Sequence, residues 1–281
     1  MLPTTFWTNS IWFVILWVLT AIELIIIFVK AKDKKITFVL YCAVIAMIFI
    51  YESIICFVFK SYEYYPQFSL NKYDNIMLGN ICSQYSVAAT AILIAVLNLK
   101  NYWYVIFSCA YSIIETIYLN LGIYKQNWYN TWMTAIGTII LFWLVKKMYN
   151  YNKDGLKPLP RYFYILLSVF TLYVNSTYIP RLIGIASFVN PFTPSDQLMG
   201  TSLIASADFA IMSNIFMLIY FYKSKWQWKI LIIPAIYSYY YIAKKFGFLY
   251  IMQGWFLAYT TFCMVIMYLY IYILDKCYSR E

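Results

Sequence analysis

Acidic side chains interrupt the long apolar stretches of this chain at Glu23, Glu52, Glu115 and Asp208. An ionisable group inside an apolar segment is costly to bury, usually faces the interior of a helix bundle and suggests a functional site. A carboxyl in such a setting can hold a proton or a cation. A structural interpretation stays open beside this one, in which the acids accept hydrogen bonds from tyrosine hydroxyls on neighbouring helices.

Other polar residues gather around these acids. Asn80 and Gln84 lie in the apolar segment after Glu52, and Asn120 follows Glu115 by about one turn. In the second half of the chain, Tyr241 matches Glu115, and the region that matches Glu52 offers Asn175 with Arg181 nearby as a counter-ion. Asp208 is the buried acid of that half. The predicted ligand-binding site or ion pathway therefore comprises Glu52, Asn80, Gln84, Glu115, Asn120, Arg181 and Asp208. Its expected ligand is small and polar or cationic.

Several kinds of chemistry are excluded by what the sequence lacks. Histidine is absent, which removes Ser/His and Cys/His catalysis and histidine metal sites. The six cysteines form no CxxC pair, and the eight glycines form no phosphate-binding loop. We therefore predict no catalytic triad, no cofactor site and no metal site. The formal charge of +10 is spread over short loops, so nucleic acid is not an expected partner.

The elements that position these residues are membrane-spanning helices. Hydrophobic residues make up 64% of the 281 residues and charged residues only 11%, against about a quarter in soluble domains. About 20 mostly apolar residues cross a bilayer as a helix, and windows of that size recur along the chain. The predicted spans are 11–29, 36–59, 77–97, 102–121, 128–145, 162–180, 198–222, 227–243 and 255–274. The lipid bilayer is therefore the first expected partner.

The predicted fold is all-α, a single polytopic transmembrane helix bundle over residues 1–281. An extra first helix occupies 1–35, and two four-helix repeats occupy 36–150 and 160–276. Ser112, Glu115 and Gly122 in the first repeat match Ser238, Tyr241 and Gly247 in the second. A four-helix unit returns the chain to its starting side, so the two repeats should be parallel, as in some transporters. The eighth span is the shortest and contains Pro234.

Orientation follows from the 21 lysines and arginines. Most of them lie in the loops after spans one, three, five and seven and in the C-terminal tail. Because cytoplasmic loops of membrane proteins are enriched in these residues, the N-terminus is predicted outside and the C-terminus in the cytoplasm. Glu52, Glu115 and Asn80 would then lie toward the outside.

The first repeat also resembles a known family, over residues 36–150. The residues that carry the resemblance are Tyr51-Glu52-Ser53-Ile54, Tyr64-Tyr65-Pro66, Asp74-Asn75, Leu78-Gly79-Asn80, Ser83-Gln84, Glu115, Leu121-Gly122-Ile123-Tyr124, Asn127-Trp128 and Thr131-Trp132. This pattern resembles an uncharacterised family of small multi-pass membrane proteins from spore-forming Firmicutes. The resemblance implies a bacterial cytoplasmic membrane and no particular reaction.

Three functional classes remain open on sequence alone. The leading hypothesis is a small-molecule or ion permease, or a related ligand sensor, with an outward-facing polar site. The alternative is a membrane accessory or assembly protein that docks a membrane protein partner and has a packed interior. The third is a membrane enzyme that uses two of the carboxylates, which would have to lie close together.

Overall fold

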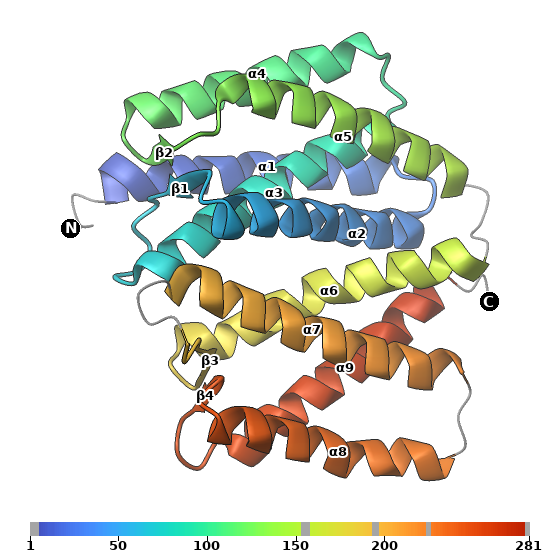
Figure 1. The fold of residues 1–281 in the computed structure, drawn as a ribbon. Helices are drawn as coiled ribbons and strands as arrows, with labels where there is room; N and C mark the ends of the chain where they lie inside the picture. Colours follow the sequence, from blue (N-terminus) through green and yellow to red (C-terminus); the bar gives the residue numbers. More distant parts are fainter. Residues whose placement is uncertain (1–5, 153–157, 193–196, 223–225, 279–281) are drawn as a thin grey trace. The chain divides into compact units, whose positions relative to one another are not determined.

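The computed structural model describes residues 6–152, 158–192, 197–222 and 226–278, so both chain ends lie outside the described residues. The chain divides into two compact units, an N-terminal unit of residues 1–157 and a C-terminal unit of residues 158–281. Each of the predicted spans falls on one α-helix of the described residues (Figure 1). Long apolar runs therefore predicted the helices well.

The N-terminal unit contains five α-helices and two short strands in its described part. Two π-helical segments extend these helices: η1 precedes α1, and η2 follows α2. The elements are η1 (Phe6–Ser10), α1 (Ile11–Lys30), α2 (Lys34–Glu52), η2 (Ser53–Val58), β1 (Tyr62–Tyr64), α3 (Lys72–Val96), α4 (Tyr102–Asn120), β2 (Tyr124–Gln126) and α5 (Thr131–Asn152).

Helix boundaries in this unit follow ordinary capping chemistry. The Asp33 carboxylate accepts the backbone N–H of Ile36 at the start of α2, and the Asn71 side chain accepts that of Tyr73 at the start of α3. Side-chain oxygens at these positions satisfy backbone donors that have no partner within the helix. Asn98 ends α3 with a φ of +49°, a left-handed conformation that asparagine tolerates.

Helix α3 forms the centre of the N-terminal unit and packs against α1, α2 and α5. Its second half is rich in buried alanine, at positions 88, 89, 91 and 95. Small residues let helix backbones approach closely, which is how helices associate within a bilayer. The outer face of α1 is apolar and exposed instead, with Ile25 64% and Val29 71% exposed. Such a face suits contact with lipid.

The C-terminal unit contains four α-helices and two strands in its described part. They are α6 (Pro158–Leu182), β3 (Ala186–Phe188), α7 (Gln197–Phe221), α8 (Trp226–Lys245), β4 (Leu249–Ile251) and α9 (Phe256–Tyr278). Helix α9 packs against α6 and α7. Arg161 on α6 donates from both Nε and Nη2 to the Asp275 carboxylate on α9, at 3.0 and 2.6 Å. The Tyr220 hydroxyl of α7 donates to the same carboxylate.

Each unit also holds a two-stranded antiparallel ribbon that the apolar pattern did not predict. Strand β1 pairs with β2 and β3 pairs with β4, each over three residues. The glycine before β2 and the one before β4, Gly122 and Gly247, both have positive φ values, of 69° and 77°. From α2 onward the N-terminal unit runs helix, strand, helix, helix, strand, helix, and the described C-terminal unit has the same order (Figure 1).

Seven of the described helical segments are long and apolar enough to cross a membrane, as judged by length and composition. They are Phe6–Lys30, Lys34–Val58, Lys72–Val96, Thr131–Asn152, Pro160–Leu182, Gly200–Phe221 and Phe256–Cys277. Helices α4 and α8 fall outside this set, and α8 continues through Pro234 as one helix. These segments indicate an integral membrane protein.

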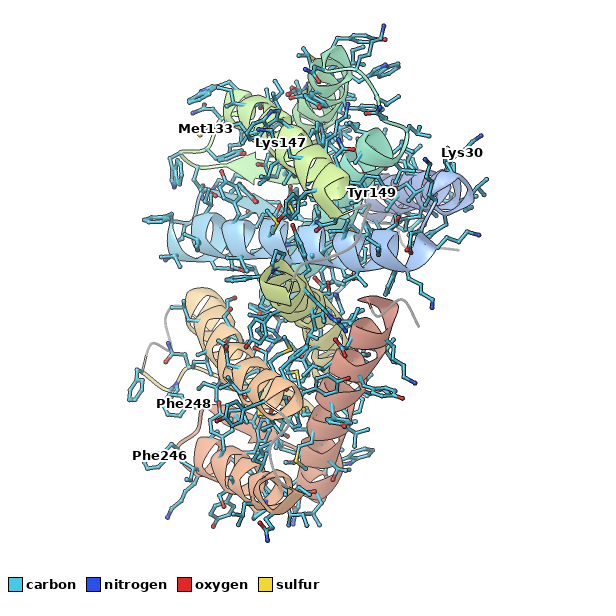
Figure 2. All side chains as sticks on the ribbon, turned by 90° about the vertical axis from the view of Figure 1, so that its right-hand side faces the viewer. Lys30, Met133, Lys147, Tyr149, Phe246 and Phe248 are labelled. Carbon is cyan, nitrogen blue, oxygen red and sulfur yellow. The ribbon has the colours of Figure 1, made fainter. Side chains whose placement is uncertain are left out.

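Basic residues gather at one end of the N-terminal unit, opposite the β1–β2 ribbon. Lys30 ends α1, and Lys147 lies in the last turns of α5 (Figure 2). The Lys147 Nζ lies 3.8 Å from the centroid of the Trp143 ring. Lysines with aromatic neighbours are typical of a helix end at a membrane surface.

Candidate ligand-binding cavity

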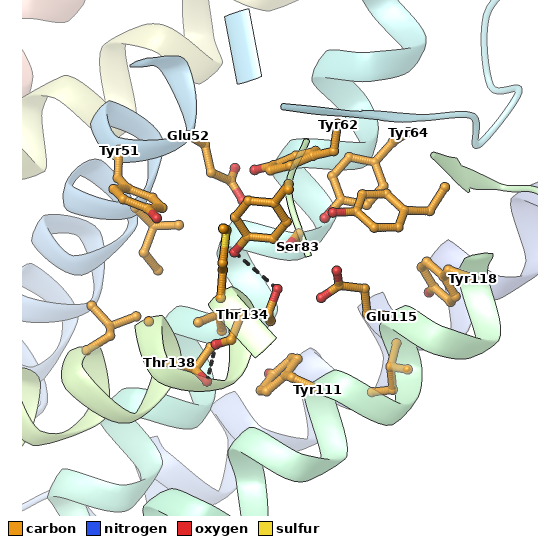
Figure 3. A pocket seen from close by; sticks show the side chains of 18 of the residues that line it. Tyr51, Glu52, Tyr62, Tyr64, Ser83, Tyr111, Glu115, Tyr118, Thr134 and Thr138 are labelled. Carbon is orange, nitrogen blue, oxygen red and sulfur yellow. Dashed lines mark hydrogen bonds between the residues drawn. The ribbon is translucent and has the colours of Figure 1, made fainter. Parts of the chain in front are cut away.

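A cavity of about 550 Å³ lies inside the N-terminal unit. Its described lining comes from α1, α2, β1, α3, α4, β2 and α5, together with the loop that precedes α5 (Figure 3). Pockets that hold small molecules usually have volumes of about 300–1,000 Å³ and mostly apolar walls with a few placed polar groups. Both predicted acids of this unit, Glu52 and Glu115, are among the lining residues.

Glu52 is the last residue of α2 and is only 6% exposed. Gln84 on α3 donates from its Nε2 to the Glu52 Oε2 at 2.6 Å. The Gln84 side chain is itself only 2% exposed, so the surrounding packing holds its amide in place. A neutral amide therefore fixes one carboxylate oxygen, while the Glu52 side chain faces the cavity (Figure 3).

Glu115 reaches the cavity from α4. Its Oε1 accepts from the Nε2 of Gln126 at 2.5 Å and from the Thr131 hydroxyl at 3.4 Å. Gln126 is the last residue of β2, and Thr131 is the first residue of α5. The ribbon and the helix start thus position this acid together, which the sequence did not indicate.

The β1–β2 ribbon lines the cavity with tyrosines. Side chains alternate between the two faces of a strand, so Tyr62 and Tyr64 share one face of β1 and Tyr124 lies on the same face of β2. The Tyr64 and Tyr124 ring centroids are 4.8 Å apart, and those of Tyr62 and Tyr129 are 5.2 Å apart. Burial raises the pKa of the Tyr62 and Tyr64 hydroxyls well above the ordinary value, so both stay neutral donors.

Close packing of β1 on α3 depends on Gly79. A Cβ added at this position would overlap the Cβ of Tyr64 and lie 2.8 Å from its Cγ. The absence of a side chain at Gly79 therefore lets the Tyr64 ring enter the cavity. The ribbon could not lie this close to α3 over any other residue.

The opposite face of the ribbon is charged. Glu63 forms an ion pair with Lys72 at 2.8 Å and accepts the Tyr65 hydroxyl at 2.7 Å. Partial burial would raise the pKa of Glu63, but the hydrogen bonds from Lys72 and Tyr65 outweigh it and lower that pKa. Burial and the hydrogen bond to Glu63 raise the pKa of Tyr65 to about 12. The charged groups of the ribbon thus lie away from the cavity.

The electrostatic character of the cavity is acidic. No lysine or arginine is among the described residues that line it, and the two carboxylates have amide and hydroxyl partners. The wall is otherwise aromatic or apolar, apart from Ser83 on α3 and Thr134 and Thr138 on α5. Burying a carboxylate without a positive charge beside it is costly, so a ligand that brings positive charge would stabilise the ionised form of both acids.

A hydrogen-bonded group extends from the cavity to Glu23. The Tyr111 hydroxyl, at the cavity wall, lies 2.8 Å from the Thr90 hydroxyl and 2.9 Å from that of Ser86. Thr90 donates to the Glu23 carboxylate at 2.8 Å. The sequence indicated no partner for Glu23, and the structure places Thr90 of the adjacent α3 beside it.

The remaining predicted residues of this unit lie outside the cavity lining. Asn80 packs behind it, where its Nδ2 faces the Cys56 Sγ at 3.8 Å and its Oδ1 has no hydrogen-bond partner among the described residues. Gln84 does not line the cavity itself but donates a hydrogen bond to Glu52, which does. Asn120 ends α4 and is exposed. The cavity thus gathers Glu52 and Glu115 directly and Gln84 indirectly.

Asp208 and Arg181 belong to the C-terminal unit. Asp208 is 2% exposed and accepts the Tyr240 hydroxyl at 3.4 Å, and Tyr240 lies 3.0 Å from the Tyr173 hydroxyl. The predicted counterpart of Glu115, Tyr241, is 59% exposed. Counting back seven residues from Gly122 and from Gly247 places Tyr240, not Tyr241, at the position of Glu115.

The described residues contain no group of three or more Cys, Asp or Glu side chains that could hold a metal ion. The cysteines are free thiols, and four of them are buried.

The cavity tyrosines were not predicted from the sequence, because the chain has 31 tyrosines and no pattern singled these out. The alternation of Tyr62, Glu63 and Tyr64 is the signal that could have singled out two of them.

No family model, curated protein or solved structure matches this chain.

Proposed function

We propose that this multi-pass membrane protein binds a small molecule in the cavity of its N-terminal unit and acts as a permease or a ligand sensor. The observation that carries the proposal is the convergence of Glu52 and Glu115 on one cavity of about 550 Å³. A protein that only docks a partner needs no such internal space, because helix bundles otherwise pack to high density. A formed cavity with placed polar groups is the usual mark of a ligand site.

The cavity is proposed to face the outside of the cell. The ribbon end of the N-terminal unit is opposite to the end that carries Lys30 and Lys147. Under the positive-inside rule the lysine end is cytoplasmic, so the ribbon end is external. The N-terminus would then be outside and the C-terminus in the cytoplasm. A bacterial cytoplasmic membrane fits the family resemblance of residues 36–150.

We further propose that the two units descend from one duplicated four-helix repeat. The common order of helices and strands supports this, as does the ribbon register, in which Glu63 pairs with Lys125 and Ser187 pairs with Tyr250. Gly122 and Gly247 occupy the same place before the second strand of each ribbon. Helix α1 would be the addition to the first copy.

Ligand binding is tested by screening small molecules against the purified full-length protein in lipid nanodiscs, with thermal unfolding as the readout. Gly137 lines the cavity, and a Cβ added there meets nothing within 4 Å. Gly137→Leu should therefore narrow the cavity and reduce the stabilisation by any true cavity ligand. If no compound distinguishes the two proteins, the proposal fails.

Outward access is tested by thiol labelling. Ser83 lines the cavity, and Ser83→Cys in a chain without the six native cysteines would place one thiol there. A membrane-impermeant thiol reagent added to intact cells should label it. Labelling only after the cells are permeabilised would place the cavity on the other side. Flux into liposomes then separates a permease from a sensor.

A further inference from the structure

We infer that the ligand of the cavity is an organic cation with an apolar body, with its cationic group held between Glu52, Glu115 and the ribbon tyrosines. This inference rests on the proposed ligand-binding function and names the chemical class of the ligand. It is built from the charge of the cavity, the arrangement of its aromatic rings and its shape.

Charge comes first. Two carboxylates, Glu52 on α2 and Glu115 on α4, line a cavity whose described lining has no basic side chain. Each is held by neutral donors, Gln84 in one case and Gln126 with Thr131 in the other. These donors fix the positions of the carboxyl groups but supply no positive charge, so a cationic ligand would be the group that stabilises their ionised form. An anionic ligand would meet two like charges in a low-dielectric space.

The aromatic rings favour the same class. Tyr62, Tyr64, Tyr124 and Tyr129 cluster at the ribbon end of the cavity, with ring centroids 4.8 to 5.5 Å apart within the cluster. Aromatic faces attract cations, and quaternary ammonium groups are often held in cages of such rings. At these separations the rings contact one another, so they form one aromatic wall of the cavity. Figure 3 shows Tyr62 and Tyr64 beside the space that Glu52 and Glu115 face. A cationic group between the two acids would lie against this wall.

The shape of the cavity favours a ligand that is larger than a single ion. Along α5 the lining runs from Trp132 to Leu144, a span of about 18 Å at 1.5 Å per residue. Beyond the acids the wall is apolar, with Met47 on α2, Ile114 on α4 and Leu141 on α5. A small metal ion would leave this space unfilled. A cation that carries an alkyl or aromatic body would fill both ends.

The experiment uses the full-length protein in nanodiscs and three probes with the same six-carbon chain: hexyltrimethylammonium, hexanesulfonate and 1-hexanol. Calorimetry or tryptophan fluorescence measures their binding. The cation should bind at least tenfold more tightly than either of the other probes. Glu52→Gln and Glu115→Gln should each weaken the cation at least tenfold. Glu63→Gln, the same exchange on the outer face of the ribbon, should leave binding unchanged.

Two further variants keep the test decisive. Glu115→Asp retains the charge and should keep part of the affinity that Glu115→Gln loses, which separates charge from folding. Gly137→Leu should weaken binding by narrowing the cavity. Equal affinity for the three probes, or full binding by both Gln variants, would overturn the cation assignment. If hexanesulfonate or hexanol binds and Gly137→Leu weakens it, the cavity is still a ligand site and only the ligand class is wrong.

Discussion

The contact between Gly79 and Tyr64 predicts that Gly79→Ala destabilises the protein even though alanine is the better helix former. The new Cβ would lie 2.8 Å from the Tyr64 Cγ, well inside the usual carbon–carbon separation of about 3.5–4.0 Å. The position of the Tyr64 Cβ is fixed by the backbone of β1, so no rotation of the side chain can relieve the overlap with this atom. Either the ribbon or α3 must move.

The magnitude follows from two opposing terms. Replacing a glycine by alanine inside a helix gains about 1 kcal/mol from propensity. Overpacking a filled site costs about 1–3 kcal/mol. Gly137→Ala is the matched control, because Gly137 also lines the cavity on a helix and its Cβ would meet nothing within 4 Å. The propensity gain cancels between the two variants, so Gly79→Ala should be less stable than Gly137→Ala by about 1–3 kcal/mol.

The assay is unfolding of both variants in mixed micelles with increasing SDS, followed by circular dichroism. A second measurement assigns the cause. In a Tyr64→Gly background the overlapping atoms are gone, so Gly79→Ala should there become as favourable as Gly137→Ala. Equal stability of the two alanine variants in the natural background would refute the role given to Gly79, as would an unchanged effect of Gly79→Ala in the Tyr64→Gly background.

Three other predictions concern stability and use the same unfolding assay. Glu63→Gln should reduce the free energy of unfolding by at most about 1 kcal/mol at neutral pH, the range for exposed ion pairs. The fold lowers the pKa of Glu63, so the ionised carboxylate stabilises the protein above about pH 4.3. This stabilisation should disappear as the pH falls further, because the carboxylate becomes protonated. Arg161→Lys should cost about 1 kcal/mol, because lysine cannot reproduce the two-nitrogen contact with Asp275, and equal stability would contradict that role. Gly200→Ala should destabilise the C-terminal unit, because its Cβ would lie 2.7 Å from the Asn190 Cγ; a stabilising effect would exclude this contact.

The helices could be predicted because each depends on one local property, an apolar run of about 20 residues. Glu52 and Glu115 stood out for the same reason, as acids within such runs. The ribbons could not be found in this way, because three-residue strands are too short to show a reliable period. Tyr62, Tyr64 and Tyr124 lie on those strands, so their position in the cavity could not be predicted either.

The cavity itself depends on contacts between distant segments. Its lining joins Phe13 on α1 to Leu144 on α5, and no local pattern reports on the space between them. The sequence match of Glu115 to Tyr241 rests on the pair Ser112 and Ser238. Under the proposed duplication, counting back from the glycine before the second strand of each ribbon pairs Glu115 with Tyr240 instead.

The two units place different chemistry on the same arrangement of elements. On one face of its ribbon the N-terminal unit has Tyr62, Tyr64 and Tyr124, which line the cavity, and Gln126, which holds Glu115. At the corresponding register positions, the C-terminal unit has Ala186, Phe188, Leu249 and Ile251. Hydroxyl and amide groups are costly to bury unless they find partners, so an apolar ribbon is the less demanding choice for packing alone. The polar ribbon occurs in the unit whose helices carry Glu52 and Glu115 around a cavity. In the C-terminal unit the buried acid, Asp208, is met by the hydroxyl of Tyr240. This difference between equivalent positions is what a site retained in one unit and packed over in the other would produce.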